Sequence, residues 1–265
     1  FAPKKTVLGT ELAGVVEAVG RGVTRFRPGD RVFAAPADGT GAHAEYICLP
    51  ENGAVCAMPD NLSAEQAAAI CNGALTALPF LRDSGKVRRG SKVLVIGASG
   101  SIGTFAVQLA KHFGADVTAV CSAANIELVR SLGADRAIDY TREDFTASGE
   151  TWDIIFDTVA KSSFARCRRS LRKRGVYLVT APSLATMFHM ARSAIFGGRR
   201  AVMSATGLRP AEDQRRDMVF IKGLVEAGTL TPVIDRSYPL ERIAEAHRYV
   251  GKGHKIGNVV ITANT

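Results

Sequence analysis

Short apolar runs alternate with helical segments over much of the chain, from residue 92 to residue 205. The runs are rich in β-branched residues and lie at 92–97, 116–122, 136–140, 152–159, 176–181 and 201–205. Between them, apolar residues recur at three- and four-residue spacing, as at 102–114, 125–133 and 162–175. Strands that alternate with helices form βα repeats, which build a parallel sheet covered on both faces. The sequence therefore predicts an α/β fold with a doubly wound parallel Rossmann sheet.

The two ends of the chain follow a different pattern. Residues 14–20, 30–35 and 44–50 are short alternating strand candidates separated by Gly, Pro and Asp turns. Near the C-terminus, a helix candidate at 240–253 precedes a strand candidate at 254–262. We expect this last strand to rejoin the N-terminal β module. The predicted domains are therefore 1–72 with 236–265, which form the β domain, and 73–235, which forms the nucleotide-binding domain.

Composition and charge exclude several classes of protein. No apolar run reaches the roughly 20 residues needed to span a bilayer, and the most apolar segment, 187–196, contains His189 and Arg192 and reads as an amphipathic helix or a lid. The net charge of +9 comes from small arginine groups without interleaved aromatic residues, which favours a solvated surface that attracts anionic cofactors over nucleic-acid binding. The five cysteines are scattered and are expected to be buried free thiols in a reducing compartment.

A glycine-rich segment follows the first strand of the repeat. In VLVIGASGSIGTF (93–105), Gly97, Gly100 and Gly103 stand between a strand candidate and a helix candidate. In that position they would provide a tight turn, a close backbone approach and close helix–strand packing, and the helix N-terminus would receive a pyrophosphate. The spacing G-x-x-G-x-x-G departs from the commoner G-x-G-x-x-G, and a packing turn without a ligand is the alternative. We interpret residues Gly97, Ala98, Ser99, Gly100, Ser101, Ile102 and Gly103 as a phosphate-binding loop.

The end of the second strand indicates which nucleotide this loop holds. An NAD site has a carboxylate about 20 residues after the loop, where it binds the ribose 2′-hydroxyl. Here Ser122 and Asn125 occupy that place, with Arg130 and Arg142 within reach of a 2′-phosphate. The sequence therefore favours NADPH over NADH as the cofactor.

Several motifs together resemble the medium-chain dehydrogenase/reductase superfamily, and more narrowly its zinc-free, zeta-crystallin-like quinone oxidoreductases. They are LGTELAGVVEAVGRGVTRFRPGDRVFA (8–34), GAHAEYICLP (41–50), the glycine loop with its following helix and strand, LGADRAIDY (132–140) and YPLERIAEAHRYVGKGHKIGNVVIT (238–262). The resemblance implies a GroES-like β domain, to which the C-terminus returns, and a Rossmann domain. Family members usually carry several dozen further residues before the point where this chain begins, and that stretch contributes part of the substrate pocket.

The resemblance also implies contacts to the cofactor. Ser122, Asn125 and Tyr140 are expected at the 2′-phosphate. Thr76, Thr180 and Ala181 are expected near the nicotinamide, and Asn258 where the C-terminal strand approaches the cofactor. For Thr76, Tyr140 and Asn258, purely structural roles are the alternative. No Tyr, His or Lys stands out as a catalytic acid, so the catalytic residues are unknown, and Glu11 is expected to organise the β domain.

The residue at position 10 indicates whether the chain can bind the zinc ion of the related alcohol dehydrogenases. Zinc-dependent alcohol dehydrogenases have a zinc-binding histidine before the glutamate of this motif, whereas this chain has Thr10 before Glu11. A hydroxyl is a poor zinc ligand, and the four-cysteine structural zinc loop is missing. We therefore predict that the protein binds no zinc.

Without a Lewis acid, reduction of an electrophile that accepts hydride directly is the favoured reaction. The predicted function is an NADPH-dependent reductase of a quinone or an α,β-unsaturated carbonyl. An enoyl-thioester reductase, or a cofactor-binding protein with little catalysis in a crystallin-like, RNA-binding or trafficking role, are the alternatives. The chain is expected to be cytoplasmic and to form a homodimer through the edge of the sheet at 201–205, as family members commonly do.

Overall fold

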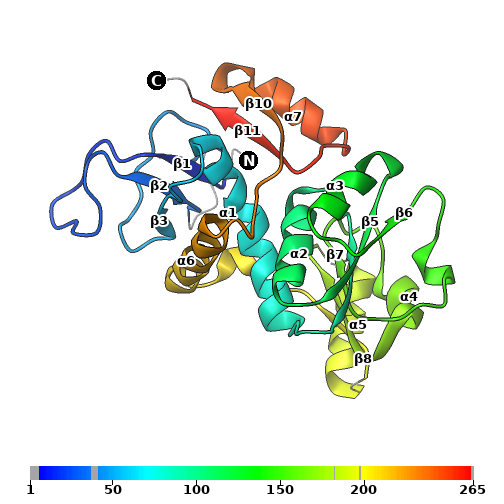
Figure 1. Cartoon of the computed structure of the whole chain (residues 1–265). Helices are drawn as coiled ribbons and strands as arrows, with labels where there is room; N and C mark the ends of the chain where they lie inside the picture. The colour runs from blue at the N-terminus through cyan, green and yellow to red at the C-terminus, as the bar shows by residue number, and fades with distance from the viewer. Residues whose placement is uncertain (1–5, 37–40, 182, 197, 264–265) are drawn as a thin grey trace. The chain divides into compact units, whose positions relative to one another are not determined.

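The computed structural model describes residues 6–36, 41–181, 183–196 and 198–263, which divide into two compact units. Unit 1 comprises Phe1–Leu75 with Thr206–Thr265, and unit 2 comprises Thr76–Ala205. The elements of both units are labelled in Figure 1. Among the described residues, no helix is both long enough and apolar enough to cross a membrane.

Unit 2 contains a six-stranded parallel sheet in the order β6-β5-β4-β7-β8-β9, as the alternating sequence pattern predicts. Its strands are β4 (Lys92–Ile96), β5 (Asp116–Cys121), β6 (Arg136–Asp139), β7 (Trp152–Asp157), β8 (Leu171–Val179) and β9 (Arg200–Val202). Its helices are α2 (Ser101–His112), α3 (Ile126–Ser131), α4 (Phe164–Cys167) and α5 (Leu184–Phe196). The chain winds outward from β4 in one direction and from β7 in the other, so α2 and α3 cover one face of the sheet and α4 and α5 the other (Figure 1).

The core of unit 2 lies on the two faces of this sheet. Phe80 of the π-helical turn Phe80–Ser84 stacks on Phe156 with ring centroids 4.9 Å apart. The only tryptophan, Trp152, is buried and donates from Nε1 to Thr118 Oγ1 at 3.3 Å. Gly114 follows α2 with a φ of +78°, the left-handed conformation in which glycine ends helices, as the sequence predicts.

One predicted helix of unit 2 is wrong over half of its length. The segment 162–175 is helical only at α4 and in one 3₁₀ turn, and β8 already begins at Leu171. Leu171 pairs with Trp152, and the ladder resumes where Val176 pairs with Ile154. The residues between them bulge out of the strand, with Arg174 at a φ of +72°. The spacing of apolar residues in 162–175 therefore predicts a helix, although the second part of the segment forms an irregular strand.

Unit 1 is built from two small sheets. The strands β1 (Leu12–Val15), β2 (Arg31–Ala34) and β3 (Val55–Ala57) form an antiparallel sheet in the order β1-β2-β3. The strands β10 (Ile234–Pro239) and β11 (Asn258–Thr262) pair in parallel around α7 (Ile243–Gly251). The C-terminal strand therefore belongs to unit 1, but its partner is β10 and not the β1–β3 sheet. The predicted strand at 44–50 is absent from the described structure, where Tyr46 is 66% exposed.

The boundary of the units differs from the one that the sequence suggests. Helix α6 (Ala211–Glu226) groups with unit 1, whereas the sequence-based division assigns it to the nucleotide-binding domain. Asn61 Nδ2 donates to the Val225 carbonyl at 2.9 Å, and Lys222 Nζ to the Met58 carbonyl at 3.3 Å. These bonds hold α6 against the segments around β3. Helix α1 (Ala64–Pro79) runs from unit 1 into unit 2.

All five cysteines are free, and four of them are buried as expected. Cys48 is the exception because it is exposed.

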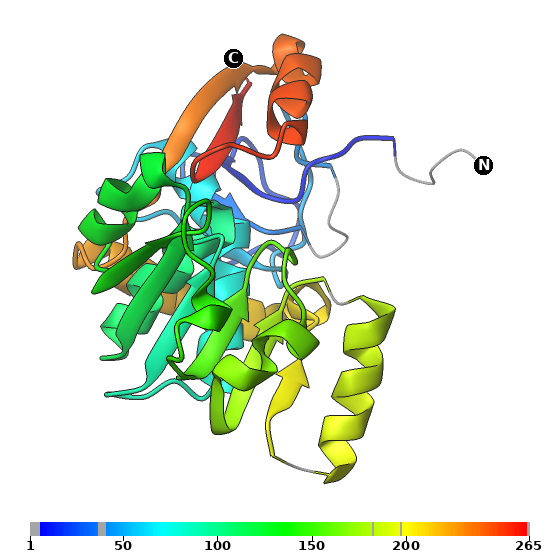
Figure 2. The same cartoon turned by 90° about the vertical axis from the view of Figure 1, so that its right-hand side faces the viewer.

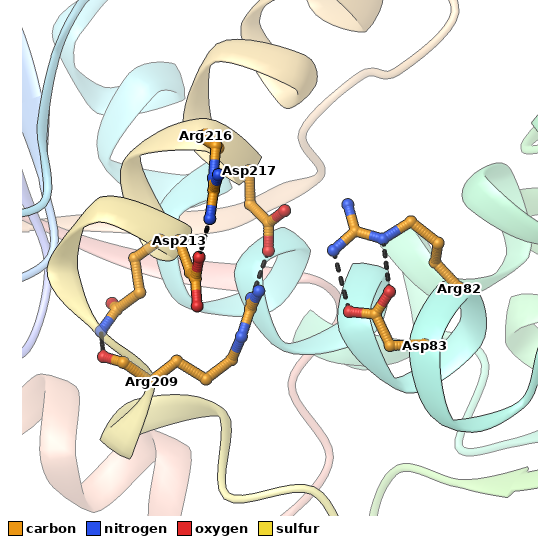
Figure 3. Close-up of polar contacts among 7 residues, drawn as sticks. Arg82, Asp83, Arg209, Asp213, Arg216 and Asp217 are labelled. Carbon is orange, nitrogen blue, oxygen red and sulfur yellow. Dashed lines mark hydrogen bonds and ion pairs between the residues drawn. The ribbon is translucent and has the colours of Figure 1, made fainter.

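Two aspartates of α6 form ion pairs that differ in how far they are buried (Figure 3). Arg209 Nη1 donates to Asp217 Oδ2, and these side chains are only 21% and 5% exposed. One turn earlier on the same helix, Asp213 pairs with Arg216, whose side chain is 69% exposed. Removing one partner of a buried pair leaves the other charge uncompensated, whereas an exposed pair contributes little.

We therefore predict that Asp217→Asn lowers the free energy of unfolding by about 2–3 kcal/mol. The matched change Asp213→Asn on the same helix should cost no more than about 0.5 kcal/mol. Denaturant titrations of the two variants and the wild type measure both values. Equal losses would show that burial does not set the contribution of these pairs.

Candidate cofactor-binding site

The glycine loop joins β4 to α2 at the carboxyl edge of the sheet. Gly97 has a φ of +75°, which favours glycine. A Cβ on Gly103 would lie 2.1 Å from the Gly97 carbonyl oxygen and 2.7 Å from the Ala98 Cα, so only glycine fits there. A Cβ on Gly100 would meet nothing closer than 3.4 Å, so this position is open. The first turn of α2 therefore packs directly on the end of β4.

The N-terminus of α2 leaves backbone donors available. Its N-cap is Gly100, which has no side chain to cap the helix, and the first intrahelical bond runs from Thr104 N to the Gly100 carbonyl at 2.9 Å. Within the described part of the chain, the backbone N–H groups of Ile102 and Gly103 have no hydrogen-bond acceptor. Such groups, together with the helix dipole, favour an anion. The loop therefore fits a pyrophosphate.

A polar cluster lies beside the loop at the end of β5. Asn125 Nδ2 donates to Ser99 Oγ at 3.0 Å and to Ser122 Oγ at 3.2 Å. Ser122 is the N-cap of the 3₁₀ turn 123–125, and its own side chain caps no backbone group of that turn. One residue of the glycine loop and two residues predicted to determine the nucleotide thus meet at one point. Their hydroxyl and amide groups can donate hydrogen bonds.

Tyr140 is the fourth polar group near this point. Its backbone N–H donates to the Cys121 carbonyl at 3.2 Å, which places it at the ends of β5 and β6. Its side chain is 58% exposed. The structure therefore brings Tyr140 to the same sheet edge as Ser122 and leaves its ring on the surface rather than in the core.

The opposite side of the loop contacts the segment after β7, which sequence reasoning missed. Thr158 Oγ1 donates to the Ile96 carbonyl at 2.8 Å and lies 3.3 Å from the Gly97 carbonyl oxygen. Thr180 Oγ1 in turn donates to the Thr158 carbonyl at 3.3 Å. Thr158 therefore links the glycine loop to Thr180, one of the residues expected near the nicotinamide. Ala181 follows Thr180 and is exposed.

Asp157, the last residue of β7, accepts hydrogen bonds that fix the conformation of this segment. Its buried carboxylate accepts from the Ser162 N–H at 2.8 Å, from the Val159 N–H at 3.2 Å and from the Tyr177 hydroxyl at 2.9 Å. Burial, and then the Asp157 charge, raise the pKa of Tyr177. The available sequence signal was an Asp at the last position of a mostly apolar strand, because a buried carboxylate there needs hydrogen-bond donors from the following turn.

Two further predicted residues, Thr76 and Asn258, belong to other elements. Thr76 is buried in α1. Asn258 belongs to unit 1, where it is buried at the start of β11 and its Nδ2 donates to the Val233 carbonyl at 3.0 Å. Their roles at the cofactor stay predictions.

The residues expected to matter for a metal lie in unit 1. Thr10 is exposed at the start of β1. Among the described residues, no group of three or more His, Cys, Asp or Glu side chains could hold a metal ion. His43 and His247 form an edge-to-face ring contact at 5.7 Å, and burial of His43 lowers its pKa.

Glu11, next to Thr10, has an unusual environment. Its Oε2 accepts the backbone N–H of Asn72, inside α1, at 2.7 Å. Burial raises the pKa of Glu11 to about 7, against the opposing effects of this hydrogen bond and of the Lys255 charge. Lys255 donates to the Gly257 carbonyl at 2.5 Å. Glu11 therefore connects the segment before β1, the helix α1 and the segment before β11 within unit 1, as an organising residue would.

This environment predicts a pH dependence of stability. Glu11 has an ordinary pKa of 4.5 and a folded-state pKa of about 7, so the folded state holds its proton over that interval. The free energy of unfolding should therefore fall as the pH rises from 4.5 to about 7, by up to about 1.4 kcal/mol per pH unit. Glu11→Gln should remove this fall. Denaturant titrations at several pH values measure it.

The control is Glu51→Gln. Glu51 is a glutamate whose pKa is lowered by hydrogen bonds from Thr24 and Arg25. This variant should retain the fall above pH 4.5 that Glu11 produces. If Glu11→Gln retained it as well, the carboxyl would be ionised throughout, and the assigned environment would be wrong.

Comparison with known protein families agrees with this geometry. Residues 132–261 match the family profile described as zinc-binding dehydrogenase, and residues 1–60 match the alcohol dehydrogenase GroES-like domain. The NAD(P)H oxidoreductase RTN4IP1, mitochondrial, of Mus musculus is 35% identical over 96% of this chain and 69% of its own length. A chloroplast envelope quinone oxidoreductase homolog of Arabidopsis thaliana is 32% identical over 98% of this chain and 82% of its own length.

Solved structures share the fold over nearly the whole chain. The quinone oxidoreductase of Coxiella burnetii superposes with a TM-score of 0.86 and 26% identity, covering 97% of this chain and 79% of that one. A mycobacterial protein in complex with NADPH superposes with a TM-score of 0.82 and 27% identity, covering 96% of this chain and 82% of that one. The chain belongs to the medium-chain dehydrogenase/reductase superfamily, whose quinone oxidoreductases are among its relatives.

Proposed function

We propose that this protein is an NADPH-dependent oxidoreductase that reduces a quinone or an α,β-unsaturated carbonyl compound without zinc. The observation that carries the proposal is the cluster of Ser99, Ser122 and Asn125 beside a glycine loop whose helix has uncapped backbone donors. Relatives described as quinone oxidoreductase and as NADPH-dependent alkenal/one oxidoreductase support the substrate class.

Different residues of the chain would bind different parts of the cofactor. The amides of Ile102 and Gly103 would hold the pyrophosphate, and Ser122 and Asn125 the 2′-phosphate. Thr180 would lie toward the nicotinamide, positioned through Thr158. The bound cofactor supplies hydride to an electrophilic acceptor. The protein has to orient that acceptor and place hydrogen-bond donors at its oxygen.

The preference for NADPH rests on charge at the end of β5. No carboxylate stands at Ser122 or Asn125, and hydroxyl and amide donors suit a phosphate. Asp139 ends the neighbouring strand, but its Oδ1 accepts from the Thr141 N–H at 3.0 Å and the Thr141 hydroxyl at 2.8 Å. Arg142 forms a long ion pair with Asp139 Oδ2 at 3.8 Å and is 82% exposed, whereas Arg130 forms a closer one with Glu127 at 3.1 Å. Arg142 is therefore the better placed of the two arginines to assist.

The experiment that tests the function is a screen of NADPH consumption by the full-length protein against quinones, enones, enoyl thioesters and aldehydes. Turnover of quinones or enones supports the proposal. Turnover of enoyl thioesters alone would replace it with an enoyl-thioester reductase. Tight NADPH binding without any turnover would favour a cofactor-binding protein of another role.

Cofactor choice should change when Ser122 becomes acidic. Ser122→Asp puts a carboxylate where the 2′-phosphate would bind and gives the 2′-hydroxyl of NADH an acceptor. The ratio of NADH to NADPH affinity should rise by on the order of 100-fold or more. Calorimetric dissociation constants for both cofactors measure it.

Ser148→Asp is the matched control, because Ser148 lies before β7, at the opposite edge of the sheet. It should leave the ratio unchanged. A wild type that prefers NADH, or an unchanged ratio in Ser122→Asp, would show that the 2′-phosphate site lies elsewhere.

The protein should contain no stoichiometric zinc, because Thr10 stands where the family's histidine ligand would be. Elemental analysis after mild dialysis should find far less than one zinc per chain. One zinc per chain would overturn the argument from Thr10.

A homodimer is expected through β9, which lies at the edge of the sheet and pairs only with β8 among the described strands. Unpaired edge groups can pair with a symmetry mate. Light scattering at micromolar concentration should show a dimer, and Val202→Pro should weaken it by removing a backbone donor. A wild type that is monomeric would contradict this expectation.

The expected cytoplasmic location also stays a prediction. The names of two relatives place those proteins in the mitochondrion and at the chloroplast envelope. Fractionation of cells that express the chain would locate it.

A further inference from the structure

Helix α5 has an inner side that packs on the sheet and an outer side that is exposed. Toward the sheet, Thr186 is buried, Met190 packs against the core, and the His189 ring lies 5.4 Å from the Phe164 ring of α4. The outer side carries Leu184, Met187 and Phe188, and these are 86%, 53% and 67% exposed. These three residues, with the exposed Ala191, are spaced as one face of a helix. We call them the apolar stripe.

A surface helix normally turns charged residues outward. The apolar stripe reverses this pattern, because its large side chains lie in water while a threonine and a histidine face the protein. Large exposed apolar groups that are contiguous mark a surface that another body covers. The stripe is therefore a docking surface, and the charges around it indicate what docks.

Unpaired cations gather around the C-terminal end of α5. Figure 2 shows α5 beside β9, which starts directly after it. Arg199 Nε donates to the Leu171 carbonyl at 2.6 Å, which ties this end of α5 to the start of β8. The exposed cations around the start of β8 are Arg168, Arg169, Lys173 and Arg174. We call them the basic rim.

The basic rim has no internal counter-charge. Nearby arginines such as Arg166 and Arg172 pair with Asp144 and Asp153. The members of the rim form no ion pair with any other described residue. The protein therefore leaves several positive charges unneutralised next to an exposed apolar face.

We propose that α5 and the basic rim dock on an anionic membrane surface. A bilayer supplies both complements at once, since its headgroups carry negative charge and its acyl region accepts apolar side chains. A nucleic acid would neutralise the charges of the basic rim but would not bury the side chains of the apolar stripe. A second copy that docked its own stripe here would cover the apolar groups but would supply no negative charge to the rim. The short helix would lie in the interface without crossing the bilayer.

The test is cosedimentation of the full chain with lipid vesicles. Vesicles of phosphatidylcholine with about 30 mol % phosphatidylserine should bind the protein at least about tenfold more tightly than phosphatidylcholine alone. About 0.5 M salt should weaken that binding strongly. The double variant Leu184→Ser/Phe188→Ser and the double variant Arg168→Gln/Arg169→Gln should each reduce it by about tenfold.

Matched controls come from unit 1. Leu208 and Val219 are exposed apolar residues there, at 88% and 57%. Arg248 and Lys252 are exposed cations on and after α7. Leu208→Ser/Val219→Ser and Arg248→Gln/Lys252→Gln should bind the anionic vesicles like the wild type. Thermal unfolding of every variant checks that each one is folded.

Three results would overturn the proposal. The first is a wild type that stays in the supernatant with all vesicles. The second is a dimer that Leu184→Ser/Phe188→Ser dissociates, which would make a second copy the occupant. The third is binding of single-stranded RNA that depends on the basic rim, without binding of vesicles.

Discussion

The contact between the first turn of α2 and the end of β4 is the interaction on which the rest of the site depends. It brings Gly103 so close to the Gly97 carbonyl and to Ala98 that no side chain fits between them. Because the helix starts there without a capping side chain, its first backbone donors face the carboxyl edge of the sheet. A larger residue at Gly103 would push the helix away and displace these donors with it.

The sheet order explains why this edge is also where other groups converge. β4 lies between β5 and β7, so the chain leaves it in two opposite directions. The loops that follow β5 and β7 therefore flank the glycine loop, one on each side. On one side lie Ser122 and Asn125, and on the other Thr158. The fold therefore brings hydroxyl and amide groups to both sides of the glycine loop.

Much of this could be predicted because the pattern is local. The alternation of apolar runs with helices predicts a doubly wound parallel sheet, and the glycines predict the turn after β4. Asn125 donates to Ser99 and Ser122, so one residue of the predicted phosphate loop lies beside two residues predicted at the 2′-phosphate. Each inference needs only the strand end and the few residues after it.

The failures have long-range causes. The segment 162–175 has the spacing of a helix, but the pairing of Leu171 with Trp152 extends β8 into it. The assignment of α6 to unit 1 depends on bonds such as that of Lys222 with the Met58 carbonyl, between residues far apart in the sequence. The role of Thr158 likewise requires knowing that β7 lies next to β4. No periodicity in the sequence contains this information.

We expect NADPH to bind at the loop from Gly97 to Gly103 and at the neighbouring turn, Ser122–Asn125. Hydrogen exchange of the backbone amides, followed by mass spectrometry with and without NADPH, tests it most directly. NADPH should slow exchange in the peptides that cover these two segments, and NADH should protect the second segment less. Protection confined to other segments of the chain, or none at saturating NADPH, would contradict the account.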